Sequence, residues 1–109
     1  MIKASIADDH PLMLEGIKRV LNREMDINIV GEASTGTDVM KMLAEEMPDI
    51  LILDLTMPGK SGLDILKDIK IIYPDLSVLI LSIHPEERFA VRCIKAGAAG
   101  YLCKSGIVN

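Results

Sequence analysis

The chain has 109 residues, half of them hydrophobic, and a formal net charge of −4, which suits one globular domain with a layered core. Its Lys and Arg residues are scattered, so we expect no nucleic-acid binding by this segment. No apolar run approaches the ~20 residues that span a bilayer and no signal peptide is present, so we expect no membrane contact and a cytoplasmic location. Cys93 and Cys103 lack the CxxC spacing, which predicts buried, reduced thiols rather than a disulfide or a zinc site.

Five short apolar segments alternate with amphipathic segments of helical length. This alternation predicts an α/β fold with a parallel sheet. The third apolar segment is hydrophobic at every position, which is typical of a central strand covered on both faces. The expected strands are 4–7, 27–31, 50–53, 78–81 and 100–103.

Apolar residues at helical spacing predict four helices between the strands. Pro11 and Pro85 suit the first position of a helix. Thr35 and Ser61 each precede an Asp by three residues, which is the spacing of a capping box with Asp in place of Glu. The apolar faces of the first three helices are expected to hold Met13, Ile17, Val20 and Leu21, then Val39, Leu43 and Met47, then Ile65, Ile69 and Ile72.

Acidic residues stand at the ends of the first and third expected strands. Asp8 and Asp9 follow the first strand and Asp54 follows the third, and the carboxyl ends of parallel strands share one edge, where doubly wound folds bind ligands. Three close carboxylates repel one another unless some are protonated or a cation lies among them. Because no His or Cys stands at the matching strand ends, Mg²⁺ is the expected cation, and the backbone carbonyl of Thr56 could complete its shell.

Two further polar residues are expected at the same edge. Ser82 ends the fourth strand and Lys104 follows the fifth, so a hydroxyl and a cation would join the carboxylates. This combination favours phosphoryl chemistry, in which an Asp54 oxygen attacks a phosphoryl donor in line while Mg²⁺ and Lys104 offset charge. The product would be an acyl phosphate, so the chain would be a stoichiometric phosphoacceptor and not an enzyme.

Other interpretations of these residues fit less well. Residues 59–61 resemble the end of a P-loop, but Asp54 stands where that motif needs Gly. Phosphatases of the haloacid dehalogenase type also form an aspartyl phosphate, but they carry a second Asp where this chain has Thr56. His10 begins the first helix beside two acids, and we expect it to cap or pack rather than bind metal or carry a phosphoryl group.

The chain resembles response-regulator receiver domains over nearly its full length. The resemblance rests on Asp8-Asp9, Asp54 followed by Met57-Pro58-Gly59, Ser82, and Tyr101 three residues before Lys104. It implies a doubly wound, flavodoxin-like sheet of five parallel strands in the order 2-1-3-4-5. Residues 8–11, 81–84 and 97–102 resemble the NarL/FixJ, or LuxR-type, branch, which implies an output domain that binds DNA.

The resemblance also assigns roles. It implies Mg²⁺ held by Asp9, Asp54 and the Thr56 carbonyl, with Asp8 in support, and a phosphoryl group bound by Lys104 and Ser82. Ser82 and Tyr101 would form a switch, because Ser82 can move toward the new phosphoryl oxygens and vacate space for the Tyr101 ring. Thr56 and His84 would influence the lifetime of the phosphoryl group.

The end of the chain departs from the family pattern. Ser105 stands where Pro often follows the site lysine, and the sequence stops at Asn109, before a fifth helix. Residues 1–109 are therefore expected to form a receiver domain that is incomplete at its C-terminus, with the effector domain outside this chain. The uncovered sheet predicts a homodimer. The other expected partner is a sensor histidine kinase, and the alternative function is a receiver-like interaction module that works without phosphorylation.

Overall fold

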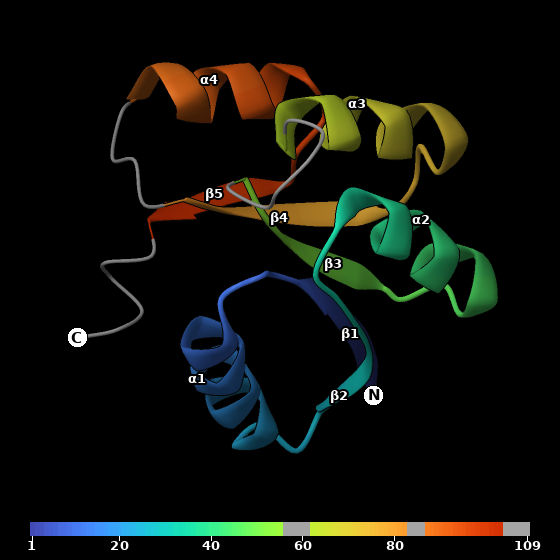
Figure 1. Cartoon of the computed structure of the whole chain (residues 1–109), viewed down its shortest axis with the longest axis vertical. Helices are drawn as coiled ribbons and strands as arrows, with labels where there is room; N and C mark the ends of the chain where they lie inside the picture. The colour runs from blue at the N-terminus through green and yellow to red at the C-terminus, as the bar shows by residue number, and fades with distance from the viewer. Residues whose placement is uncertain (56–61, 83–86, 104–109) are drawn as a thin grey trace.

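The computed structural model describes residues 1–55, 62–82 and 87–103. Strands and helices alternate along them (Figure 1): β1 (Ile2–Ala7), α1 (Pro11–Asn22), β2 (Ile27–Ala33), α2 (Gly36–Glu45), β3 (Ile50–Asp54), α3 (Gly62–Ile72), β4 (Ser77–Ser82), α4 (Glu87–Lys95) and β5 (Gly100–Cys103). All neighbouring strands are parallel and their order is β2-β1-β3-β4-β5. The predicted doubly wound, flavodoxin-like sheet is confirmed.

Helices cover the sheet unequally. Helix α1 lies on one face, whereas α2, α3 and α4 lie on the other (Figure 1). Strand β3 shows how a central strand serves both layers, since Leu51 and Leu53 pack under α2 and α3 and Ile52 packs with Ile6 and Ile17 of the α1 side. Alternate side chains of one strand point to opposite faces, so a strand buried on both faces must be apolar throughout.

The predicted helix faces are right in the helix centres and wrong at the ends. Ile17, Val39, Leu43, Ile65 and Ile69 are buried as expected. In contrast, the exposed fractions of three predicted core residues are 51%, 40% and 56%: Val20, Met47 and Ile72. Val20 and Ile72 lie in the last turns of α1 and α3, and Met47 lies beyond the end of α2. After α2 the apolar spacing outlasts the helix, whereas in α1 Val20 faces away from the core and Leu21, one residue later, still packs against it.

Local signals for the helix starts are confirmed where the structure describes them. Pro11 occupies the first turn of α1, and the Thr35 hydroxyl accepts a hydrogen bond of 3.1 Å from the Asp38 N–H. Ser61 and Pro85 lie outside the described residues. Cys93 is a free, buried cysteine as expected, and burial raises the pKa of its thiol.

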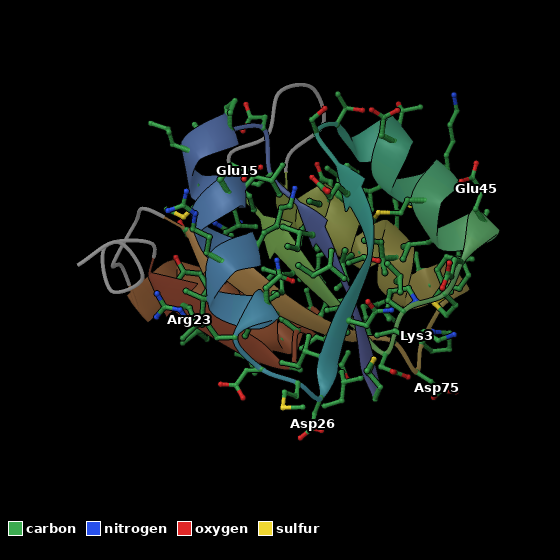
Figure 2. All side chains as sticks on the ribbon, turned by 90° about the horizontal axis from the view of Figure 1, so that it is seen from below. Lys3, Glu15, Arg23, Asp26, Glu45 and Asp75 are labelled. Atoms are coloured by element: carbon green, nitrogen blue, oxygen red, sulfur yellow. The ribbon has the colours of Figure 1, made fainter. Side chains whose placement is uncertain are left out.

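The charged surface carries both signs. Figure 2 shows labelled charged side chains on the outside of the molecule, at Lys3, Glu15, Arg23, Asp26, Glu45 and Asp75. Lys18 lies 3.3 Å from Glu15 and 3.2 Å from Glu32, and these hydrogen-bonded carboxylates raise the pKa of Lys18. Such exposed pairs add little to stability. None of the helices within the described residues is long and apolar enough to cross a membrane.

Candidate metal and phosphoryl site

The carboxyl ends of β1 and β3 bring two acidic residues together. Ala7 of β1 is paired with Leu53 of β3, so the next residues, Asp8 and Asp54, lie side by side at this edge of the sheet. Backbone hydrogen bonds fix both ends, because the Asp8 N–H donates to β2 and the N–H of the residue after Asp54 donates to β4. The side chains of Asp8 and Asp54 are fully buried. Both carboxylates are therefore shielded from water.

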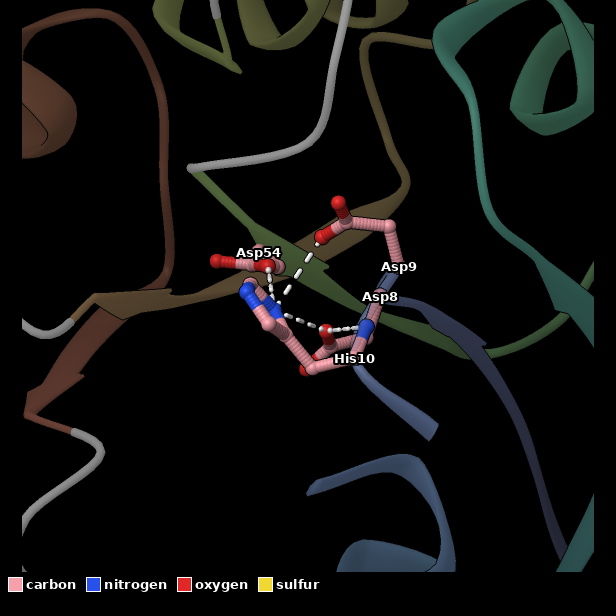
Figure 3. A group of neighbouring side chains, drawn as sticks. All are labelled: Asp8, Asp9, His10 and Asp54. Carbon is pink, nitrogen blue, oxygen red and sulfur yellow. Dashed lines mark hydrogen bonds and ion pairs between the residues drawn. The ribbon is translucent and has the colours of Figure 1, made fainter. Parts of the chain in front are cut away.

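Asp9 and His10 complete the cluster (Figure 3). One ligand atom from each of Asp8, Asp9, His10 and Asp54 lies within 4.8 Å of the other three. The Asp9 side chain is 27% exposed and that of His10 is 53% exposed, so the cluster opens to solvent on their side. The carboxylate group predicted from the strand ends is thus formed, with a histidine that was not predicted to join it.

The His10 ring lies over the carboxylates. Its Nδ1 atom is 3.0 Å from Asp8 Oδ1, 3.1 Å from Asp9 Oδ1 and 3.4 Å from Asp54 Oδ2. His10 was expected to cap or to pack; it is the residue before α1, and its side chain makes no capping hydrogen bond. The ring nevertheless lies among the carboxylates, where no histidine was expected. An extended backbone at His10 (φ −101°, ψ 105°) and the 2.8 Å hydrogen bond from its N–H to Asp8 turn the ring back over the acids.

Ser82 and Tyr101 lie on the neighbouring strands. Asp54 is paired with Leu81 of β4, so the fully buried Ser82 stands one residue further along, at the same edge as the carboxylates. Tyr101 of β5 is paired with Ile80, is half-buried, and packs against the core on the sheet face that α2, α3 and α4 cover. The structure therefore places Ser82 at the site edge and Tyr101 two residues before the end of β5. The other predicted site residues, Thr56, His84 and Lys104, lie outside the described residues.

The described donors fit a hard divalent cation. Two of the three carboxylates are fully buried, and their charges need a cation or protons among them. Carboxylate oxygens are the ligands that Mg²⁺ prefers, and the open side leaves room for water in its shell. The His10 nitrogen is the one donor in the cluster that does not belong to an all-oxygen site.

A hollow of about 270 Å³ adjoins the cluster beside α1 and α2. Its lining residues are Asp8, Leu14, Glu32, Ala33, Ser34 and Asp38. Three of these six side chains are acidic, so the hollow extends the negative potential around the cluster. Cations are therefore favoured on this side of the site.

Comparisons with known proteins agree on the same part of the chain. The family profile for the response regulator receiver domain matches residues 4–107. The transcriptional regulatory protein DegU of Brevibacillus brevis is 37% identical over 103 residues, which cover 94% of this chain and 44% of that protein. The chain spans about half the length of the curated relatives it matches.

Solved structures extend the likeness to three dimensions. A LuxR-family two-component response regulator from Aurantimonas sp. has a TM-score of 0.91 at 32% identity, over 96% of this chain and 75% of that one. The isolated receiver domain of RcsB from Salmonella enterica serovar Typhimurium, solved in the presence of the phosphomimetic BeF3⁻, has a TM-score of 0.91 at 31% identity, over 96% and 78% of the two chains.

Proposed function

The chain belongs to the response regulator receiver domain family, of the NarL/LuxR type, and on this premise we propose that Asp54 is its phosphoacceptor. The observation that carries the proposal is the position of Asp54. Its carboxylate is fully buried at the carboxyl end of the central strand β3, within 4.8 Å of ligand atoms of Asp8 and Asp9. The related RcsB domain was solved with a phosphomimetic, which supports phosphoryl chemistry on this fold.

The proposed reaction is transfer from a phosphohistidine of a sensor histidine kinase. One Asp54 carboxylate oxygen attacks phosphorus, and the O–P bond forms as the N–P bond to the donor histidine breaks. The electron pair of the broken bond stays on the histidine nitrogen, and the product is an acyl phosphate on Asp54. Phosphoryl transfer depends mainly on positioning and charge, so the chain's task is to hold this oxygen in line with the donor. The receiver acts once per phosphoryl group, as an acceptor rather than a classical enzyme.

Mg²⁺ is the proposed cofactor. Asp9, Asp54 and the backbone carbonyl of Thr56 would hold it, and Asp8 would support the site. When bound, the ion offsets the negative charge of the phosphoryl oxygens. The clustering of buried carboxylates on two neighbouring strands supports this assignment, because such charges need a counterion.

The switch completes the proposal. Ser82 and Lys104 would bind the phosphoryl oxygens, and Thr56 and His84 would modulate the lifetime of the acyl phosphate. Movement of the buried Ser82 hydroxyl toward Asp54 would change the packing at the end of β4. The Tyr101 ring would then turn into the vacated space and alter the surface that carries α4.

The wider regulator is also proposed from its relatives. These are about twice as long as this chain, and the Brevibacillus relative is named a transcriptional regulatory protein. We infer that residues 1–109 are a receiver domain that controls a LuxR-type DNA-binding effector domain, and that this chain forms a homodimer. A receiver-like module that works without phosphorylation is the alternative that the experiment must separate.

Binding of BeF3⁻ tests the acceptor and the switch together. In amide NMR spectra of the chain with Mg²⁺, the phosphomimetic should shift the resonances of Asp54, Ser82 and Tyr101. Asp54→Asn should abolish these shifts, and so should excess chelator. Asp75→Asn, on an exposed residue before β4 (Figure 2), is the matched control and should respond like the wild type. A spectrum of the folded wild type that stays unchanged would contradict the proposal and favour the phosphorylation-independent module.

A further inference from the structure

The ring nitrogen of His10 has the spacing of a metal ligand. Neighbouring ligand atoms of a tetrahedral or octahedral site with bonds of about 2.1 Å lie roughly 3.0 to 3.4 Å apart. Nδ1 lies 3.0, 3.1 and 3.4 Å from oxygens of Asp8, Asp9 and Asp54. The nitrogen therefore has the separation of a neighbouring ligand from each of the three carboxylates, and one ligand atom from each of the four residues lies within 4.8 Å of the others (Figure 3).

A single hydrogen bond does not account for the arrangement, because Nδ1 also lies at ion-pair distance from Asp9 and Asp54. Nδ1 carries at most one hydrogen, and its hydrogen-bond contact is with Asp8 Oδ1 at 3.0 Å. Asp9 Oδ1 is a buried atom that makes no hydrogen bond to any described residue, although it lies 3.1 Å from the same nitrogen. A cation bound among these atoms would give that oxygen a ligand bond in addition to its 3.1 Å approach to the ring nitrogen.

We propose that His10 sets the metal selectivity of this cluster. Mg²⁺ takes oxygen ligands, whereas imidazole nitrogen is a preferred ligand of Zn²⁺, Ni²⁺ and related divalent ions. For ions of that class the His10 ring is a fourth ligand in place. For Mg²⁺ the same ring fills part of the coordination space and adds no favourable bond. The site therefore binds imidazole-preferring ions far more tightly than three carboxylates alone would, and these ions compete with Mg²⁺.

The inference deepens the proposed metal site but does not depend on phosphoryl transfer. Its test is direct calorimetric titration of the chain with Co²⁺ and with Mg²⁺, at one fixed pH and without a phosphodonor. His10→Ala should weaken Co²⁺ binding by at least about tenfold, the lower end of the loss seen even for outer partners of metal ligands. Mg²⁺ binding should stay equal or become tighter. The control Asp9→Asn, in the same cluster, should weaken the binding of both ions.

The ratio of the two affinities decides the question. A Co²⁺-to-Mg²⁺ ratio that His10→Ala leaves within about threefold of the wild-type value would overturn the role of His10. If the wild type binds neither ion, the proposed metal site fails, and the selectivity inference fails with it. The two failures are thus distinguishable.

A second readout does not need the His10 variant to fold. The chain has two histidines, so in His84→Gln the only imidazole resonances in the NMR spectrum are those of His10. Stoichiometric Zn²⁺ should shift the ring resonances of His10 strongly, and saturating Mg²⁺ should not reproduce that shift. A His10 ring that does not respond to Zn²⁺ would overturn the proposal.

Discussion

Removing one negative charge from the cluster should stabilise the metal-free chain. Asp8 and Asp9 are neighbours in the sequence and repel each other in the unfolded chain too, so folding mainly adds the repulsion between Asp9 and Asp54. Their ligand atoms lie within 4.8 Å, where two unit charges at an effective dielectric constant of 20 cost about 3 kcal/mol or more. Asp9 is 27% exposed, and solvent screening reduces this to about 1 kcal/mol. Asp9→Asn should raise the free energy of unfolding by that amount.

Urea unfolding in excess chelator, at one fixed pH for all variants, measures this free energy. With saturating Mg²⁺ the order should reverse, because ligand binding to the folded wild type adds RT ln(1 + [Mg²⁺]/Kd) and the variant lacks a ligand. Asp75→Asn is the control and should stay within about 0.5 kcal/mol of the wild type in both conditions. An Asp9→Asn variant that is less stable than the wild type in chelator, or equal stabilisation of both proteins by Mg²⁺, would contradict a repulsive, metal-binding cluster.

Four further predictions concern the scaffold. An added Cβ at Gly62 would lie 2.5 Å from the Cα atom of Leu55 and 2.8 Å from its carbonyl oxygen. Gly62→Ala should therefore lower the free energy of unfolding in urea by about 2 kcal/mol. A decrease below about 0.5 kcal/mol would contradict this close packing. Thr35→Ala removes the hydroxyl that caps α2 and should lower the free energy of unfolding by about 1 kcal/mol. Thr35→Ser keeps a hydroxyl and should retain most of the wild-type stability. The Lys70 ammonium donates hydrogen bonds to two carbonyls before β4, at 2.7 and 2.8 Å. Lys70→Met should therefore lower the free energy of unfolding by about 1 to 2 kcal/mol. A melting temperature equal to that of the wild type would contradict this role of Lys70. Because burial raises the pKa of the Cys93 thiol, the unfolded chain releases this proton first, and stability should fall as the pH rises past about 8.5. In urea unfolding curves measured at a series of pH values, the free energy of unfolding of Cys93→Ala should decrease less with rising pH than that of the wild type.

The sheet could be predicted from the sequence because its signals are local. Each apolar run matches a strand within two residues at either end, and the meeting of Asp8 and Asp54 follows from the shared edge of parallel strands. The helix ends were less predictable. Met47 continues the apolar spacing of α2 but stands beyond its last residue, Glu45, since spacing alone does not show where the contact with the sheet stops.

The place of His10 could not be predicted from spacing. Its side chain is brought over the carboxylates by the backbone angles of a single residue and by one hydrogen bond to Asp8. Neither leaves a periodic pattern in the sequence. The available signal was the position of a histidine directly after two acids, which equally favours a helix cap. The roles of Ser82, Tyr101 and Lys104 stay predictions that rest on the family.

Covalent labelling of Asp54 is the decisive measurement. The chain is incubated with acetyl phosphate or phosphoramidate, with Mg²⁺ or with excess chelator, and its intact mass is recorded beside that of Asp54→Asn. We predict an increase by one phosphoryl group that requires both Mg²⁺ and Asp54. A wild-type chain that binds Mg²⁺ and stays unmodified, or an Asp54→Asn variant that is labelled as fully as the wild type, would contradict the assignment of Asp54 as the phosphoacceptor.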